Sequence, residues 1–163
     1  MKILITGGAG YIGTELAYGL SVLPGVSKIT IYDNVSRGNY NLFLGKKIDG
    51  PAINFIQGEI LDSRKLRQVL KEVDVVYHLA AKVTTPFANL DGHVFEQINH
   101  WGTAELVYAL EESNVKQCVF ISSTSVYGST SEPATEETQT NPDSFYSLSK
   151  FRAEQHVQRL ASK

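Results

Sequence analysis

Residues 1–13 read MKILITGGAGYIG, a short apolar run followed at once by a glycine-rich turn. The run from Lys2 to Thr6 predicts a buried β-strand, and the residues after the turn have helical periodicity. A pyrophosphate needs backbone N–H groups at close range, which a turn without side chains offers, and the N-terminus of the next helix adds partial positive charge. We therefore expect Gly7, Gly10 and Gly13 to form a dinucleotide-binding turn, in which Gly13 lets the helix pack closely on the sheet. Similar turns also reverse a strand into a helix without any ligand, so the motif alone leaves both interpretations open.

Asp33 ends the second predicted strand, about twenty residues after Gly13. At this spacing a carboxylate meets the two hydroxyls of an adenosine ribose, whereas it repels the 2′-phosphate of NADP. The spacing therefore favours NAD over NADP as the cofactor. Arg37 leaves an alternative open, because its side chain either reaches a 2′-phosphate or is a solvated loop charge.

Further apolar runs rich in β-formers follow along the chain, each succeeded by a segment with helical periodicity, which is typical of a parallel sheet covered on both faces. We predict strands at Lys2–Thr6, Lys28–Tyr32, Ile53–Gln57, Asp74–Leu79 and Gln117–Ser122, and helices at Ile12–Leu23, Ser63–Glu72, Gly92–Ser113 and Pro142–Ser162. Right-handed crossovers between these elements give an α/β fold, a Rossmann-type doubly wound parallel sheet. The continuous apolar runs Val75–Tyr77 and Val119–Ile121 predict strands buried on both faces.

A polar segment, Ser129–Asn141, separates the last predicted strand from the last predicted helix. Its Thr, Glu and Pro residues indicate a surface loop. We expect Asn141 to cap the following helix, with Pro142 in the first turn.

Length and composition place the chain among ordinary folded α/β proteins. The chain has 163 residues, 42% of them hydrophobic and 20% charged, which suits one domain with its own core over residues 1–163. A net charge of −2 gives no broad attraction to nucleic acid or to an anionic membrane. One cysteine, Cys118, excludes an internal disulfide, and the spacing of the histidines suggests no metal site. The start of the chain does not resemble a signal peptide, so we expect a cytoplasmic protein.

Several motifs in one order make the sequence similar to a known family. They are residues 6–13 of the turn, Asp33-Asn34, His78-Leu79-Ala80-Ala81, Asn99 with Gly102-Thr103, residues 122–128 (SSTSVYG), and Tyr146-Ser147-Leu148-Ser149-Lys150. Together they resemble the extended short-chain dehydrogenase/reductase family, and within it the NAD-dependent epimerase/dehydratase group typified by UDP-glucose 4-epimerase. The resemblance covers nearly the whole chain.

The resemblance implies a set of cofactor-binding residues that extends beyond the glycine turn. These are Gly7, Gly10, Tyr11, Ile12, Gly13, Asp33, Asn34, Glu59, Ile60, Leu79, Ala80, Ala81, Tyr146 and Lys150. The family usually has Asp at the position of Glu59, which sets this chain apart at the adenine. Lys82 either joins the cofactor site or is a solvated loop lysine.

The resemblance also implies Ser123, Tyr146, Lys150 and Asn99 as the catalytic residues. Tyr146 and Lys150 are four apart on a predicted helix and so share a face, where the ammonium favours the phenolate. An unperturbed Tyr has a pKa of about 10, so it needs such help to act as a base near neutral pH. Ser123 would donate a hydrogen bond to the reacting oxygen. For Asn99 a structural role inside the helix is an equal alternative.

The implied reaction is the 4-epimerisation of a nucleotide sugar through a transient 4-keto intermediate. Thr124 and Ser125 stand where dehydratases of the family carry Asp and Glu, which favours an epimerase. The alternatives are an NAD(P)-dependent nucleotide-sugar or ketone reductase or dehydratase, and a non-catalytic NAD-binding module.

The resemblance further implies a protein of about twice this length, whose second half supplies later strands and the domain that binds the nucleotide sugar. We therefore expect the chain to be a fold truncated before those strands, to bind NAD, and to lack turnover in isolation. Without a sixth strand, Val119–Ile121 would form an open sheet edge. A homo-oligomer or a completing chain is the expected partner.

Overall fold

The computed structural model describes residues 1–45, 50–83 and 91–161. The described part contains a sheet of five parallel strands in the order β3-β2-β1-β4-β5. The strands are β1 (Lys2–Thr6), β2 (Lys28–Asp33), β3 (Ile53–Gln57), β4 (Val75–His78) and β5 (Gln117–Phe120). This order confirms the Rossmann-type doubly wound sheet. Because the order reverses at β1, a crevice opens between the carboxyl ends of β1 and β4, where such folds bind ligands.

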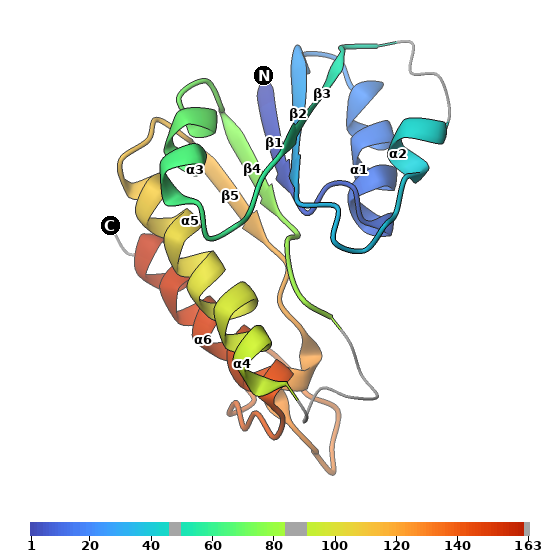
Figure 1. The fold of residues 1–163 in the computed structure, drawn as a ribbon. Helices are drawn as coiled ribbons and strands as arrows, with labels where there is room; N and C mark the ends of the chain where they lie inside the picture. Colours follow the sequence, from blue (N-terminus) through green and yellow to red (C-terminus); the bar gives the residue numbers. More distant parts are fainter. Residues whose placement is uncertain (46–49, 84–90, 162–163) are drawn as a thin grey trace.

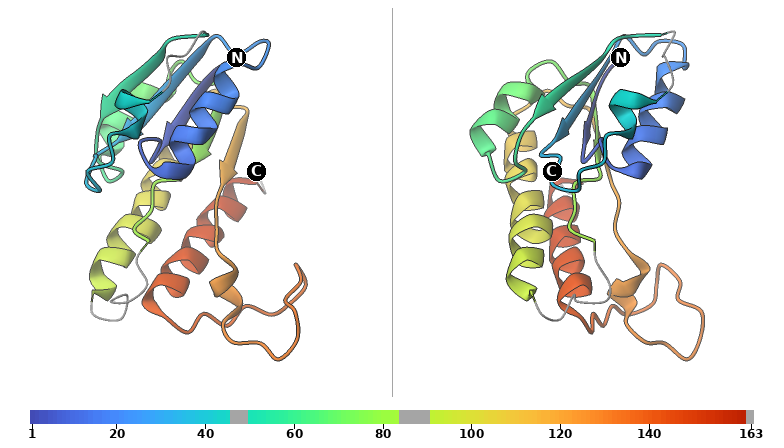
Figure 2. Two further views of the ribbon diagram at one scale, coloured as in Figure 1. Left: turned by 90° about the vertical axis from the view of Figure 1, so that its right-hand side faces the viewer. Right: turned by 45° about the vertical axis from the view of Figure 1, so that its right-hand side comes forward.

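The helices lie on both faces of the sheet (Figures 1 and 2). They are α1 (Tyr11–Ser21), α2 (Asn41–Leu44), α3 (Ser63–Leu70), α4 (Gly92–Phe95), the π-helical η1 (Glu96–Trp101), α5 (Gly102–Glu111), the 3-10 helix η2 (Thr124–Tyr127) and α6 (Phe145–Ala161). Figure 1 shows α1 and α2 on one side of the sheet and α3, α5 and α6 on the other.

The core on each face follows from the alternation of side chains along the strands. Leu4 and Val76 point to the α3 and α5 side, where Leu66 and Leu106 complete a buried group. Their neighbours in the sequence pack against α1 on the other side; Ile3, Ile5, Ala17, Ile29 and Ile31 form that group. Since both faces are covered, β1 is apolar at consecutive positions, as parallel strands in such sheets are.

The long helix predicted over Gly92–Ser113 has a π-helical segment in its middle. Residues 92–111 run through α4, η1 and α5 without a break, and the wider turn lies at Glu96–Trp101. Such segments are rare and often lie at functional sites. Asn99 lies inside this one, so the sequence indicated the position but not the change in helix type.

The predicted start of the last helix is wrong. Asn141 does not cap α6; it lies at the base of the preceding loop, where its N–H donates to the carbonyl of Val126 at 2.9 Å. Helix α6 begins at Phe145. Ser144 lies directly before it, and the Ser147 N–H donates to the Ser144 Oγ at 3.1 Å, as at a helix N-cap.

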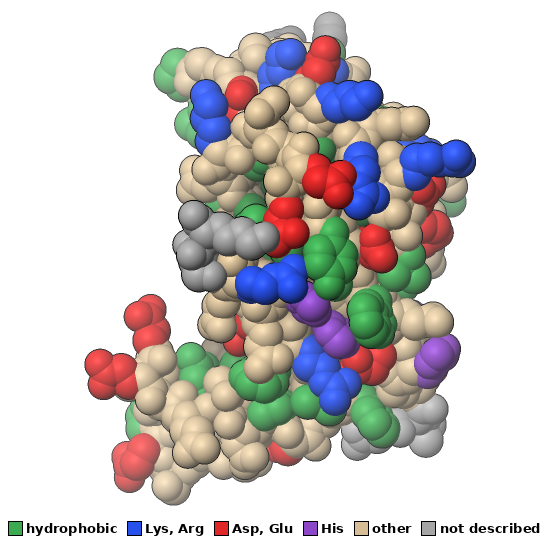
Figure 3. Space-filling view, turned by 90° about the vertical axis from the view of Figure 1, so that its left-hand side faces the viewer, with side chains coloured by type: hydrophobic (Ala, Val, Ile, Leu, Met, Phe, Trp, Pro, Cys, Tyr) green, Lys and Arg blue, Asp and Glu red, His purple; other side chains and the backbone are tan. Residues whose placement is uncertain are grey.

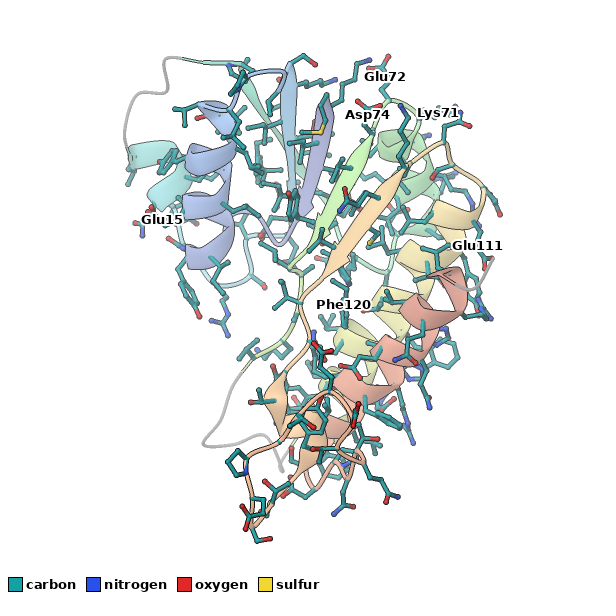
Figure 4. The ribbon with its side chains drawn as sticks, turned by 180° about the vertical axis from the view of Figure 1, so that it is seen from behind. Glu15, Lys71, Glu72, Asp74, Glu111 and Phe120 are labelled. Carbon is teal, nitrogen blue, oxygen red and sulfur yellow. The ribbon has the colours of Figure 1, made fainter. Side chains whose placement is uncertain are left out.

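The prediction that β5 is buried on both faces is also wrong. Its residues are exposed or partly exposed, and Ile121 just beyond it is 47% exposed. Figure 4 shows the molecule from behind, with β5 ending near Phe120 and with α5 and α6 on one side of it. The strand is the edge of the sheet, so only one of its faces meets a helix layer.

No helix in the described ranges is long and apolar enough to cross a membrane.

Candidate active site

The glycine turn joins β1 to α1 and touches the ends of both neighbouring strands. Gly7 has φ +69°, and a Cβ there would lie 2.5 Å from the backbone N of Ala80, so only glycine fits. The Gly7 N–H donates to the carbonyl of Tyr32 at 2.8 Å. A Cβ on Gly13 would lie 2.5 Å from the Cα of Gly8, so Gly13 packs on the turn itself. The turn is therefore held tight against β2 on one side and β4 on the other.

The first turn of α1 presents its N–H groups without a competing side chain. Gly10 is the N-cap residue and offers no side-chain acceptor, and the first turn contains no acidic residue. Tyr11 and Ile12 are 70% and 49% exposed at this end of the helix. Unpaired N–H groups and the helix dipole together suit an anion such as a pyrophosphate.

Asp33 lies at the carboxyl end of β2, beside the glycine turn. Its Oδ2 accepts the N–H of Ala9 at 3.0 Å, and its Oδ1 accepts the N–H of Val35 at 2.7 Å. Val35 has φ +58°, which strains a β-branched residue, and the bond to Asp33 helps to hold it there. The carboxylate thus connects the turn to the loop after β2.

Glu59 and Ile60, which the resemblance places at the adenine, lie in different environments. The Glu59 Oε2 accepts from the Asn34 Nδ2 at 3.0 Å, and the Glu59 carbonyl accepts from the Tyr32 hydroxyl at 2.8 Å. Burial, followed by the charges of Asp62 and Glu59, raises the pKa of Tyr32 to about 12. Ile60 is only 6% exposed and belongs to the core, so its backbone is the part left to face a ligand.

His78 forms the centre of a buried hydrogen-bond chain at the end of β4. Its Nδ1 lies 2.6 Å from the Thr6 Oγ1, and its Nε2 lies 2.9 Å from the Thr103 Oγ1. Because Thr103 donates its own proton to the Asn99 carbonyl at 2.6 Å, it accepts from His78, which makes the ring neutral with its proton on Nε2. Burial, with a smaller effect of the Lys150 charge, lowers the pKa of His78 to about 3. The sequence singled out His78 only as part of a family motif and did not indicate these hydrogen bonds.

Asn99 is buried and connects the loop after β4 to helix α6. Its Oδ1 accepts the Lys82 N–H at 2.7 Å, and its Nδ2 donates to the Lys82 carbonyl at 3.1 Å and to the Ser149 Oγ at 3.0 Å. Ser149 in turn donates to the Tyr146 carbonyl at 2.7 Å. The Asn99 side chain thus links the backbone of Lys82 to Ser149 on α6.

Lys150 is a buried cation, 4% exposed, on the face of α6 that meets β5. Its Nζ donates to the Ile121 carbonyl at 2.6 Å and lies 4.2 Å from the centre of the Phe120 ring. Phe120, labelled at the end of β5 in Figure 4, stacks on His78 with 5.7 Å between ring centres. Burial lowers the pKa of Lys150 to about 8, and the charge of Glu154 opposes this. The sequence did not single out Phe120, which contacts both Lys150 and His78.

Tyr146 and Ser123 lie on the two segments that flank Lys150. The Tyr146 ring meets the buried Phe95 edge to face at 5.9 Å, another contact that the sequence reasoning missed. Ser123 caps η2: its Oγ accepts the Ser125 N–H at 3.2 Å and lies 2.8 Å from the Ser125 Oγ. The fold brings the ends of β4 and β5, the π-helix and the start of α6 together at the carboxyl edge of the sheet.

A second polar cluster lies outside this site, on the face that carries α5 and α6. The Nε2 atoms of His100 and His156 are 3.1 Å apart, and Glu96 accepts from His100 at 2.8 Å and pairs with Arg152 at 2.6 Å. Figure 3 shows histidine, charged and hydrophobic side chains gathered on this face. Across the ranges that the structure describes, no group of three or more His, Cys, Asp and Glu side chains is placed to hold a metal ion.

Comparison with known proteins gives a consistent result. The model of the NAD dependent epimerase/dehydratase family matches residues 3–163. A dTDP-D-glucose 4,6-dehydratase from Dictyostelium discoideum is 32% identical, with 96% of this chain and 39% of that protein aligned. A UDP-glucose 4-epimerase from Lactobacillus helveticus is also 32% identical, over 94% of this chain and 45% of that protein.

Solved structures of similar proteins align over the entire chain. A UDP-glucuronic acid 4-epimerase from Bacillus cereus in complex with NAD is 28% identical with a TM-score of 0.83, covering 100% of this chain and 53% of that one. A dTDP-glucose 4,6-dehydratase from Streptomyces venezuelae with NAD bound is 27% identical with a TM-score of 0.88, covering 100% and 52%. The chain thus spans about half the length of these proteins or less. Its sequence, sheet order and similarity agree: the chain belongs to the NAD dependent epimerase/dehydratase family and corresponds to its NAD-binding portion.

Proposed function

We propose that the chain is the NAD-binding part of a nucleotide-sugar 4-epimerase that acts through a transient 4-keto sugar. The observation that carries the proposal is the arrangement of Tyr146, Lys150 and Ser123 around the carboxyl ends of β4 and β5. The glycine turn supports NAD as the cofactor. A Cβ at Gly7 would clash with the Ala80 backbone and one at Gly13 with Gly8, so the tight turn before the N-terminus of α1, which suits a pyrophosphate, needs glycine at both positions. When bound, NAD supplies the hydride acceptor for the sugar carbon.

The catalytic residues have distinct tasks in this proposal. Tyr146 takes the proton from the sugar hydroxyl during oxidation and returns it during reduction. Lys150 lies one helical turn after Tyr146 and supplies a positive charge near the reacting oxygen, and the Ile121 carbonyl and the Phe120 ring hold the ammonium in place. Ser123 donates a hydrogen bond to the reacting oxygen. Asn99 positions α6 through Ser149 rather than touching the sugar.

The choice of an epimerase over a dehydratase rests on the two residues after Ser123. Elimination of water from a 4-keto sugar needs acid and base groups, and Thr124 and Ser125 carry only hydroxyls with pKa values far above neutral. Ser125 is also engaged with Ser123. A 4,6-dehydratase remains the second candidate, because relatives of both kinds are equally similar to this chain.

A panel of UDP- and dTDP-hexoses tests the proposal on the longer protein that contains this chain, with the products followed by NMR. Inversion at C4 with no net change in NAD is the expected result. Accumulation of a 4-keto-6-deoxy sugar would identify a dehydratase, and net formation of NADH would identify a dehydrogenase. Binding of NAD without any turnover would leave only the cofactor-binding module.

A further inference from the structure

Arg37 lies in the loop after β2, yet its side chain reaches the loop after β4. Its Nη2 donates to the carbonyl of Val83, a residue 46 positions further along the chain. In the sheet order, β1 separates β2 from β4. The Arg37 side chain therefore spans a whole strand position at the carboxyl edge of the sheet.

The segment under this span is the glycine turn. On one side Gly7 donates to the Tyr32 carbonyl at the end of β2, and on the other a Cβ on Gly7 would meet the Ala80 backbone after β4. Arg37 and Val83 lie a few residues beyond these two contacts. Both loops leave the same edge of the sheet, so the guanidinium closes the crevice from the side of the loops, opposite the N-terminus of α1.

The guanidinium has spare capacity for an anion. It carries five N–H donors, of which one is used on the neutral carbonyl of Val83. Within the described ranges, no carboxylate lies in salt-bridge distance of Arg37. The first turn of α1 also lacks acidic residues. The crevice thus has a positive charge on one side and a helix N-terminus on the other.

The residue that anchors Arg37 is itself held in place. Val83 follows Lys82, whose N–H and carbonyl both bind the Asn99 side chain inside the π-helix. At the other end of the span, the Asp33 carboxylate binds the Val35 N–H, two residues before Arg37. Both ends of the span are therefore fixed to elements of the site.

We propose that Arg37 is a pyrophosphate clamp: its guanidinium binds phosphate oxygens of a dinucleotide from above the glycine turn, while Val83 keeps it oriented. The inference rests on the proposed binding of NAD and adds a residue to it. Arg37 does not read a 2′-phosphate in this arrangement, because its side chain is directed away from the ribose side at Asp33 and toward β4. A charge-assisted contact of this kind is strong and planar.

Titration calorimetry on Arg37→Gln and Arg37→Lys with NAD, ADP, adenosine and NADP tests the clamp. Arg64→Gln is the matched control, since Arg64 is an exposed arginine on α3, across the sheet from α1. We expect Arg37→Gln to weaken NAD and ADP about tenfold and to leave adenosine unchanged, as one lost charge-assisted hydrogen bond predicts. Arg37→Lys should recover part of the affinity, and Arg64→Gln should bind NAD like the unmodified chain.

Three results would overturn the clamp while sparing NAD binding. One is an NAD affinity of Arg37→Gln within about twofold of that of the unmodified chain, where loss of a charged contact predicts about tenfold. Another is an equal loss for adenosine, which would mean that Arg37 only orders the loops. The third is a loss confined to NADP, which would make Arg37 a 2′-phosphate contact. If the unmodified chain binds neither NAD nor ADP, the proposed cofactor site fails, and the clamp fails with it.

Discussion

The two halves of the sheet contribute polar groups to the proposed site in different ways. In the half made by β1, β2, β3 and α1, the proposed pyrophosphate site is built mainly from backbone: a glycine turn with φ +69° at Gly7 and the N–H groups of a helix start, flanked by the Asp33 and Arg37 side chains. In the half made by β4, β5, η1, α5 and α6, the polar groups of the proposed site are buried side chains. His78, Asn99 and Lys150 are 2%, 1% and 4% exposed.

This difference shows what each half requires from the protein. A bound pyrophosphate needs space and N–H groups, which cost little stability to arrange. A base that works near neutral pH needs charges and hydrogen bonds held out of water, where unpaired or charged groups destabilise the fold. We therefore expect changes in the first half to alter affinity, and changes in the second to alter turnover, pKa values and stability.

The largest expected effect comes from Tyr146→Phe in the longer protein. Removal of the hydroxyl should lower kcat by a factor of about 10² to 10⁴, since it deletes the acid/base group, and should leave NAD affinity nearly unchanged. Tyr108→Phe on α5 is the matched control and should retain normal kcat. Steady-state kinetics together with an NAD titration measure both quantities. Substantial turnover by Tyr146→Phe would place the base elsewhere.

Lys150→Met should stabilise the chain even though it removes a residue of the proposed site. Burial lowers the pKa of Lys150 from 10.5 to about 8. The protonated side chain therefore destabilises the folded state at neutral pH, and the free energy of unfolding should rise as the pH increases from 8 toward 10.5. The cost of that charge, less the lost bond to the Ile121 carbonyl, predicts a gain of about 2 kcal/mol at pH 7.

Denaturant unfolding at pH 7 measures the gain, with Lys71→Met as the control. Lys71 is exposed at the end of α3, and its replacement should change stability by less than about 0.5 kcal/mol. If Lys150→Met destabilises the chain, the ammonium is better compensated than its burial suggests.

The buried imidazole of His78 should make the chain sensitive to mild acid. Its folded pKa of about 3 lies below the unfolded value near 6.5, so only the unfolded state gains a proton as the pH falls below 6.5. The free energy of unfolding should therefore fall by about 1.4 kcal/mol per pH unit, or about 2 kcal/mol between pH 6.5 and 5. Burial and the charges of His100 and Arg159 also lower the pKa of His156, which acts in the same direction.

Two variants separate His78 from the other histidines in unfolding curves between pH 7 and 5. His78→Asn should flatten the pH dependence, at some cost in stability at pH 7. His93→Gln, at an exposed position on α4, should keep the full slope. An unchanged slope in His78→Asn would mean that another group causes the acid sensitivity.

The smallest expected effect concerns Asp33. Asp33→Ala should narrow the preference for NAD over NADP by about tenfold, because the repulsion of a 2′-phosphate disappears. The variant should also lower the melting temperature, since the carboxylate binds the N–H groups of Ala9 and Val35. Asp33→Asn keeps a side-chain acceptor without the charge, and titrations with both cofactors compare the two variants. An unaltered preference in both variants would remove Asp33 from ribose recognition.

The same contrast explains how far sequence reasoning could go. The strand order and the glycine turn were predictable, because hydrophobic runs and small residues have local causes. The proposed acid/base residues could be singled out only through a spaced motif. The hydrogen bonds that link Thr6, His78 and Thr103 could not be predicted, because they join residues up to 97 positions apart that share no sequence pattern. Phe95 and Phe120 were missed for the same reason, since only the fold brings them to the site. The sequence did single out Arg37, but it could not indicate the bond to the Val83 carbonyl.

Local signals also misled in two places. Asn141 and Pro142 resemble a helix start, but the Asn141 N–H bonds to the Val126 carbonyl in the loop, and helix α6 begins only at Phe145. The apolar run of β5 looks like a strand buried twice, although it is an edge strand in this chain. In both cases a tertiary contact, or its absence in the described residues, outweighed a local preference.

Calorimetric titration of the 163-residue chain with NAD and with NADP tests the central claim most directly. The account predicts one NAD bound per chain, more tightly than NADP, even where the chain shows no turnover of nucleotide sugars. Absence of NAD binding by the folded chain, or NADP binding that is equally tight, would contradict the cofactor site described above.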